Sequence, residues 1–134
     1  TSDYPLSLEI EKAEGIYLID TNQKKYIDFI SGIAVSNVGH RHPKVVEAIK
    51  KQVDSYLHLM VYGEYIQSPQ VKLANAIAET LADYSTKDGL KLDNVYFTNS
   101  GTEAVEGAMK LAKRFTGRTE IVACEKAYHG STHG

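Results

Sequence analysis

One stretch of the sequence constrains the fold more than any other: YFTNSGTEAVEGAMKLAKRF, residues 96 to 115. An apolar Tyr-Phe pair leads into the small residues Thr-Asn-Ser-Gly-Thr, and a helix-like sequence follows without a break. Aromatic and branched residues favour a strand, whereas serine, threonine and asparagine favour the start of a helix. The stretch therefore predicts a buried strand at VYFT, a short turn, and a helix from about Thr102 to Phe115.

The rest of the second half repeats this alternation. Ser68 before Pro69 suits the start of a helix, which an apolar stripe continues at helical spacing through Val71, Leu73, Ala74, Ile77, Ala78 and Leu81. Turn-forming residues 83–94 end this helix, and a turn at Gly117 leads into EIVACE, residues 120–125, a second buried strand. We expect an α/β fold in which helices connect parallel strands of one sheet.

The first half has a β-rich pattern. Two runs of aromatic and branched residues flank the polar DTNQKK and predict a hairpin between Leu6 and Ile30. The glycine-containing segment 31–43 is expected to be a loop, and Pro43 suits the first turn of a helix. An irregular aromatic segment near Gly63 separates the halves, so we expect one domain segment at residues 1–62 and a second at residues 63–134.

Composition excludes several classes of protein. With 134 residues, 43% hydrophobic content and a net charge of −2, the chain resembles a globular domain without the basic surface of a nucleic-acid-binding protein. The single cysteine, Cys124, excludes a disulfide framework and a cysteine-rich metal site, and fits a cytoplasmic location. The apolar runs are too short to span a membrane, and the polar first residues do not form a secretory signal.

The predicted helix start has the chemistry of an anion site. Backbone N–H groups lack intrahelical partners there, and the peptide dipoles add partial positive charge. Gly101 permits close approach to the backbone, and Ser100 and Thr102 offer hydroxyl donors, so a phosphate is the expected anion. The alternative is that Ser100 only caps the helix, together with Glu103, and Gly101 only forms the turn. The sequence contains neither GxxxxGK[ST] nor GxGxxG, which excludes the two familiar nucleotide-binding loops.

A second cluster follows the second predicted strand. Because consecutive parallel strands are usually neighbours, Tyr128, His129 and Gly130 are expected at the same sheet edge as the phosphate turn. An aromatic ring at that position can stack on a flat heteroaromatic ligand. The alternative is that His129 and His133 are ordinary surface histidines.

Together these motifs resemble the class III, or ω-type, aminotransferases that use pyridoxal 5′-phosphate. NSGTEAVEGAMKLAKRFTGR, followed by YHG one strand later, is similar to their cofactor-binding segment, and residues 15–52, with Gly-His-x-His-Pro at 39–43, resemble their amino-terminal segment. The resemblance runs from about Tyr4 to Gly134. It implies the amino-terminal part of a fold-type-I transferase, with a small-domain hairpin and helix followed by the start of the large parallel or mixed-sheet domain.

The same resemblance implies the roles of individual residues. Gly101 and Thr102 would bind the cofactor phosphate with Ser100 in support, Tyr128 would stack on the pyridine ring, and His129 would line the pocket. The implied reaction moves an amino group from an amine or ω-amino acid to a 2-oxo acid. A homodimer is also implied, with its sites at the subunit interface.

The lysine that forms the family's Schiff base is expected beyond Gly134, so we expect a fragment of a longer enzyme with no catalytic residue of its own. Lys110, Lys113 and Lys126 are expected to be solvated. Two alternatives remain open: a related aminomutase or racemase-like enzyme, and a non-catalytic module that binds a phosphate ligand. The isolated chain is expected to be marginally stable, because parallel strands need cover on both faces.

Two positions bear on the substrate. Ser131 stands where the acetylornithine, ornithine and 4-aminobutyrate branches of the family usually have an arginine that clamps a substrate carboxylate, and serine cannot make that bidentate contact. Ile33 resembles a substrate-facing position and implies an apolar pocket wall. Tyr62 and Tyr65 are expected in the core, with the pocket or the partner subunit as the alternative. The amino donor stays open.

Overall fold

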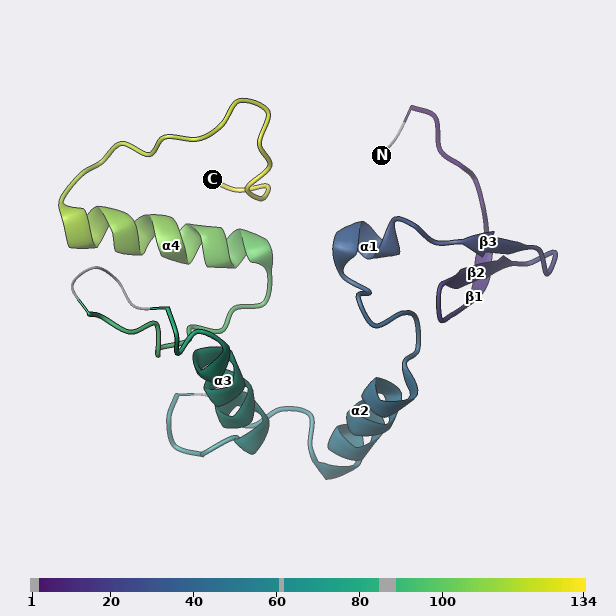
Figure 1. Ribbon diagram of the computed structural model, residues 1–134, viewed down its shortest axis with the longest axis horizontal. Helices are drawn as coiled ribbons and strands as arrows, with labels where there is room; N and C mark the ends of the chain where they lie inside the picture. Colours follow the sequence, from purple (N-terminus) through teal and green to yellow (C-terminus); the bar gives the residue numbers. More distant parts are fainter. Residues whose placement is uncertain (1–2, 61, 85–88) are drawn as a thin grey trace. The chain divides into compact units, whose positions relative to one another are not determined.

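The computed structural model describes residues 3–60, 62–84 and 89–134 (Figure 1). Within these residues the chain has three strands followed by four helices. It divides into two compact units, Thr1–Tyr65 and Ile66–Gly134. Val61 of the aromatic segment and residues 85–88 of the predicted turn after the second-half helix lie outside the described residues.

The first unit contains an antiparallel sheet whose strands pair in chain order. The strands are β1 (Ile10–Glu14), β2 (Tyr17–Asp20) and β3 (Lys25–Ile27). Glu14 pairs with Tyr17, and Tyr17 pairs with Ile27 on its other side. The predicted hairpin is confirmed by β2 and β3, and β1 adds a second hairpin to it.

Asp20 organises the turn between β2 and β3. Its Oδ1 accepts the backbone N–H groups of Asn22 and Lys24, each at 2.9 Å, and its Oδ2 accepts the hydroxyl of Tyr26 at 2.9 Å. These bonds, the N–H of Lys24 first, hold the pKa of the Asp20 carboxyl below its ordinary value. A carboxylate that collects the turn's donors in this way fixes the geometry of the hairpin.

A single turn of left-handed backbone, α1 (Ser31–Ala34), follows the sheet. All four residues have positive φ, from 44° to 63°. Ile33 is β-branched, and its φ of 60° is a strained conformation for such a residue. The sequence predicted a loop over residues 31–43, and the structure places this hydrogen-bonded turn at its beginning.

Asp28 and His40 close the segment that contains α1. Oδ1 of Asp28 accepts the N–H groups of Ile30 at 3.0 Å and Ser31 at 2.9 Å, and its Oδ2 lies 2.7 Å from Nε2 of His40. The backbone of His40 in turn pairs with Gly15, in the β1–β2 turn, through two hydrogen bonds of 2.7 and 3.0 Å. The left-handed turn is therefore fixed to the sheet at both ends.

The three long helices begin at or close to their predicted starts. They are α2 (Pro43–Ser55), α3 (Ser68–Thr80) and α4 (Gly101–Thr116). α2 and α3 each carry a proline in the first turn, as predicted. The N-cap position of α3 is Gln67 rather than Ser68, which is already helical. α4 ends at Gly117, whose φ of 70° is a left-handed conformation that favours glycine.

The two buried strands predicted in the second unit are not formed. Residues 95–98 and 120–124 belong to no helix or strand, Glu125 lies in a turn, and neither segment pairs with the other or with another described strand. Their apolar side chains are open to solvent, with Tyr96 82% and Val122 98% exposed. A parallel strand requires hydrogen-bonded neighbours and cover on both faces, and the described residues supply neither.

The helices consequently lack the sheet on which they would pack. In the described part of the chain no hydrophobic side chain is fully buried, and no Cα atom of α3 lies within 8 Å of one in α4. Apolar stripes with helical spacing are present but exposed, including Val45, Ile49 and Val53 of α2. None of the described helices has the length and apolar character needed to cross a membrane.

Candidate cofactor site at the start of α4

A reciprocal cap closes the start of α4. Ser100 has extended backbone, and its Oγ accepts the N–H of Glu103 at 3.2 Å. Oε2 of Glu103 accepts the N–H of Asn99 at 2.7 Å in return. The capping role foreseen for Ser100 and Glu103 is therefore present, and it has the form of a capping box.

The cap leaves the first N–H groups of the helix open. Among the described residues, no protein acceptor takes the N–H of Gly101 or of Thr102. The hydroxyl of Ser100 can still donate its proton, because in the cap its oxygen only accepts. Apart from its chain neighbours and the backbone of its own helix, no protein atom lies within 4 Å of the place where a Cβ of Gly101 would stand. Two free N–H groups and neighbouring hydroxyls at the positive end of a helix are a donor set that fits a phosphate monoester.

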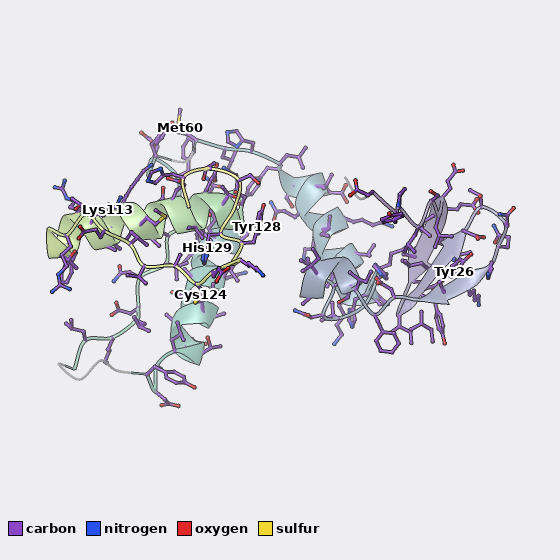
Figure 2. The ribbon with its side chains drawn as sticks, turned by 90° about the horizontal axis from the view of Figure 1, so that it is seen from above. Tyr26, Met60, Lys113, Cys124, Tyr128 and His129 are labelled. Atoms are coloured by element: carbon purple, nitrogen blue, oxygen red, sulfur yellow. The ribbon has the colours of Figure 1, made fainter. Side chains whose placement is uncertain are left out.

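The loop that contains Tyr128, His129 and Gly130 reaches this helix start. Gly130 has a φ of 107°, and a Cβ built on it would lie 2.5 Å from Oγ1 and 2.9 Å from Cβ of Thr102. Only glycine fits at such a distance. The chain after α4 turns back along the helix (Figure 1), and Tyr128 and His129 lie in the returning loop (Figure 2). The two predicted clusters therefore meet by direct contact of loop and helix rather than through paired strands.

Tyr128 presents its ring to the outside of this loop. The side chain is 81% exposed, and its hydroxyl lies 3.1 Å from Oγ of Ser131, so each residue orients the other. His129 lines a cavity of about 470 Å³ together with Val105 and Met109 of α4. Tyr128 is thus available for stacking on a ligand, while His129 faces the helix.

A residue that sequence reasoning missed holds the same loop. Oε1 of Glu106 accepts the hydroxyl of Thr132 at 2.6 Å and the N–H of His133 at 2.8 Å. These bonds, that of Thr132 first, and the nearby charge of Lys110 hold the pKa of the Glu106 carboxyl below its ordinary value. The sequence did contain a signal for the role of Glu106. Glu106 follows Thr102 by four residues, and this spacing places it one turn further along the same helix face.

The remaining predicted positions differ in their surroundings. Ile33, on the left-handed turn of the first unit, is 88% exposed. Tyr62 and Tyr65, expected in the core, are exposed, because the described residues form no core around them. Lys113, expected to be solvated, is half-buried where it lines the cavity beside His129.

Comparison with known proteins decides the family. The family model of the class-III aminotransferases matches residues 1–134, the whole chain. The chain belongs to the class-III aminotransferase family. The resemblance noted in the sequence is confirmed.

Relatives of this class-III chain include acetylornithine aminotransferases of Bacillus amyloliquefaciens and Bacillus subtilis, each 45% identical over 126 residues and 94% of the chain. The chain spans 50% of the length of the first and 30% of the second. This chain is also similar to a solved structure of taurine:2-oxoglutarate aminotransferase from Bifidobacterium kashiwanohense, in complex with PLP and glutamate. The match has a TM-score of 0.81 and 35% sequence identity, and it covers 98% of this chain and 28% of the chain in that structure. The predicted fold class is confirmed as α/β, corresponding to the amino-terminal part of a fold-type-I transferase.

Proposed function

We propose that this chain is the amino-terminal part of a pyridoxal 5′-phosphate-dependent aminotransferase that moves an amino group from an amine or ω-amino acid to a 2-oxo acid. One observation carries the proposal: the open start of α4 and the loop with the exposed Tyr128 meet where Gly130 packs on Thr102. Membership of the class-III family supports it, as does the PLP bound to the similar taurine:2-oxoglutarate aminotransferase.

The residues of the site fit this cofactor by their chemistry. The N–H groups of Gly101 and Thr102, with the hydroxyls of Thr102 and Ser100, would bind the phosphate. Tyr128 would stack on the pyridine ring. His129 lines the neighbouring cavity along α4 and would border the cofactor from that side. When bound, the cofactor supplies the electron sink of the reaction. The residues named here bind and orient it, and we assign proton transfer to none of them.

Two positions bear on the substrate class, which the family resemblance gives as an amine or an ω-amino acid. Ser131 shares a hydrogen bond with Tyr128 and carries no charge, so residue 131 would not clamp a donor carboxylate as an arginine does. Ile33 would contribute apolar surface. We propose the donor that the family resemblance implies, a primary amine or an ω-amino acid, with any donor carboxylate bound by a residue other than 131.

The wider organisation is proposed on the same grounds. Residues 1–62 would belong to the small domain and residues 63–134 would begin the large cofactor domain, and the nearby division of compact units between Tyr65 and Ile66 supports this. A homodimer follows from the family resemblance. The free, exposed Cys124 fits a reducing compartment, so we propose a cytoplasmic location.

Cofactor retention in the full-length enzyme tests the phosphate site. In the variant Gly101→Ala/Thr102→Ala, a methyl group enters the open space at Gly101 and one hydroxyl is lost. We expect pyridoxal phosphate to dissociate about tenfold faster, which corresponds to the loss of about 1.4 kcal/mol of binding free energy.

Thr116→Ala is the matched control, because it removes a threonine hydroxyl at the far end of α4, where that hydroxyl donates to the carbonyl of Ala112. We expect wild-type retention in this control. Equal retention in the double variant and the control would contradict the assignment of the phosphate site.

A further inference from the structure

The loop after Gly130 is tied to α4 at a second point. Oε1 of Glu106 accepts the hydroxyl of Thr132 at 2.6 Å and the N–H of His133 at 2.8 Å. Thr102, on which Gly130 packs, lies one turn earlier on the same face of the helix. The loop is therefore held at two successive turns of one helix face.

The charges around Glu106 act in both directions, because the positive helix start and Lys110 favour a carboxylate there and a bound phosphate would oppose it. Glu106 lies in the second turn of α4, close to the helix start where the proposed ligand carries a phosphate, and like charges repel. Lys110 on the helix and His133 on the loop are the charged and titratable groups that face it. The two loop donors give this carboxylate a specific task that its charge environment alone does not explain.

We propose that Glu106 is a positioning residue that holds the loop of Tyr128 to Gly130 at the start of α4, and thereby sets how tightly pyridoxal phosphate is retained. The inference rests on the proposed function. While Glu106 binds Thr132 and His133, Gly130 stays on Thr102, and this fixes the backbone of the loop in which Tyr128 lies two residues earlier. Without these bonds the position of the loop relative to the start of α4 is no longer fixed.

Variants of the full-length holoenzyme separate this role from simple stability. Glu106→Ala removes the acceptor, whereas Glu106→Gln keeps a carbonyl oxygen for both donors and removes the charge. We expect release of pyridoxal phosphate to become about tenfold faster in Glu106→Ala and to stay within about twofold of wild type in Glu106→Gln. Thr132→Val, which removes one donor, should fall between them. Glu120→Ala, a change at an exposed glutamate outside the loop, should release the cofactor at the wild-type rate.

A second readout needs no cofactor. In the full-length apoprotein, amide hydrogen exchange over residues 128–134 should be faster in Glu106→Ala than in wild type, and close to wild type in Glu106→Gln. The amide of His133 reports the contact directly, because it is one of the two donors.

The outcomes are distinguishable. The role of Glu106 is overturned if Glu106→Ala leaves amide exchange at His133 unchanged or releases cofactor at the wild-type rate. In that case the proposed function still stands if the Gly101→Ala/Thr102→Ala variant loses cofactor. If Glu106→Ala and Glu106→Gln lower the melting temperature equally and lose cofactor equally, Glu106 has a merely structural role. This result also overturns the proposed positioning role. A wild-type enzyme that binds no pyridoxal phosphate overturns both proposals.

Discussion

At the scale of single residues, three carboxylates fix local geometry, two in the first unit and one beside the candidate site. Asp20 gathers the donors of the β2–β3 turn, Asp28 fixes the left-handed turn, and Glu106 holds the loop after Gly130. Each has its pKa lowered by the hydrogen bonds that it accepts. The segments that these carboxylates hold should therefore become less stable in acid, where the carboxylates are protonated.

Asp28 allows the sign of this pH dependence to be tested. The N–H of Ser31 first, and then His40, hold the pKa of the Asp28 carboxyl below its ordinary value of about 3.9. Because the folded-state pKa lies below the unfolded-state value, the stabilisation is present above about pH 4 and is lost as the pH falls through the folded-state pKa. An NMR titration of the carboxyl should give a midpoint below the ordinary value.

The variant Asp28→Asn provides the comparison. It should be less stable than wild type at neutral pH, and the difference should shrink as the pH falls below about 4, since wild-type Asp28 then also loses its charge. A stability difference between the two proteins that does not change with pH would contradict this account.

Two left-handed glycines near α4 make contrasting predictions. Gly117, with a φ of 70°, has no protein atom within 4 Å of a built Cβ, so Gly117→Ala should cost about 1 kcal/mol of stability and leave cofactor release unchanged. Gly130→Ala must also push the loop off Thr102, so it should cost more and speed cofactor release. Thermal unfolding and cofactor release measured on both full-length variants check this. Equal release rates would argue against a functional contact at Gly130.

At the scale of elements, the helices were predictable and the strands of the second unit were not. α2 and α4 follow from signals within a few residues, including Pro43 in the first turn, Ser100 at the cap and Gly117 at the end. A strand is completed by a partner distant in sequence, so the composition of VYFT and EIVACE could not show whether a ladder forms. The left-handed turn at Ile33 was also hidden, because a branched residue normally argues against positive φ.

The candidate site was predictable as two motifs but not as a set of contacts. The small-residue turn before α4 and the Tyr128 loop lie together as expected from the sequence. The contact of Gly130 with Thr102 and the bonds of Glu106 with Thr132 and His133 depend on how the loop folds back over the helix, which no local pattern encodes.

Hydrogen exchange on the isolated polypeptide of 134 residues tests the difference between its elements. Amides in the middle of α4 have intrahelical acceptors and should exchange more slowly than those of residues 121–125, which have no ladder partner among the described residues. In the full-length protein both segments should be protected. Strong protection of residues 121–125 in the isolated polypeptide would contradict the unpaired state of this segment.

At the scale of the whole molecule, the chain carries the residues that we propose bind the cofactor, and its described residues form no closed hydrophobic core. The apolar stripes of its helices are exposed in the described residues, and the chain spans 30% to 50% of the length of the two Bacillus relatives. Catalysis is therefore a property to be measured on the full-length protein, where these stripes can be covered.

Amino-group transfer by the full-length protein tests the central claim most directly. The protein, loaded with pyridoxal 5′-phosphate, is supplied with a primary amine or an ω-amino acid and a 2-oxo acid. The account predicts that the amino acid corresponding to the 2-oxo acid accumulates in step with loss of the donor's amino group. Rearrangement of the donor without consumption of the 2-oxo acid, or no reaction with any amine or ω-amino acid donor, would contradict it.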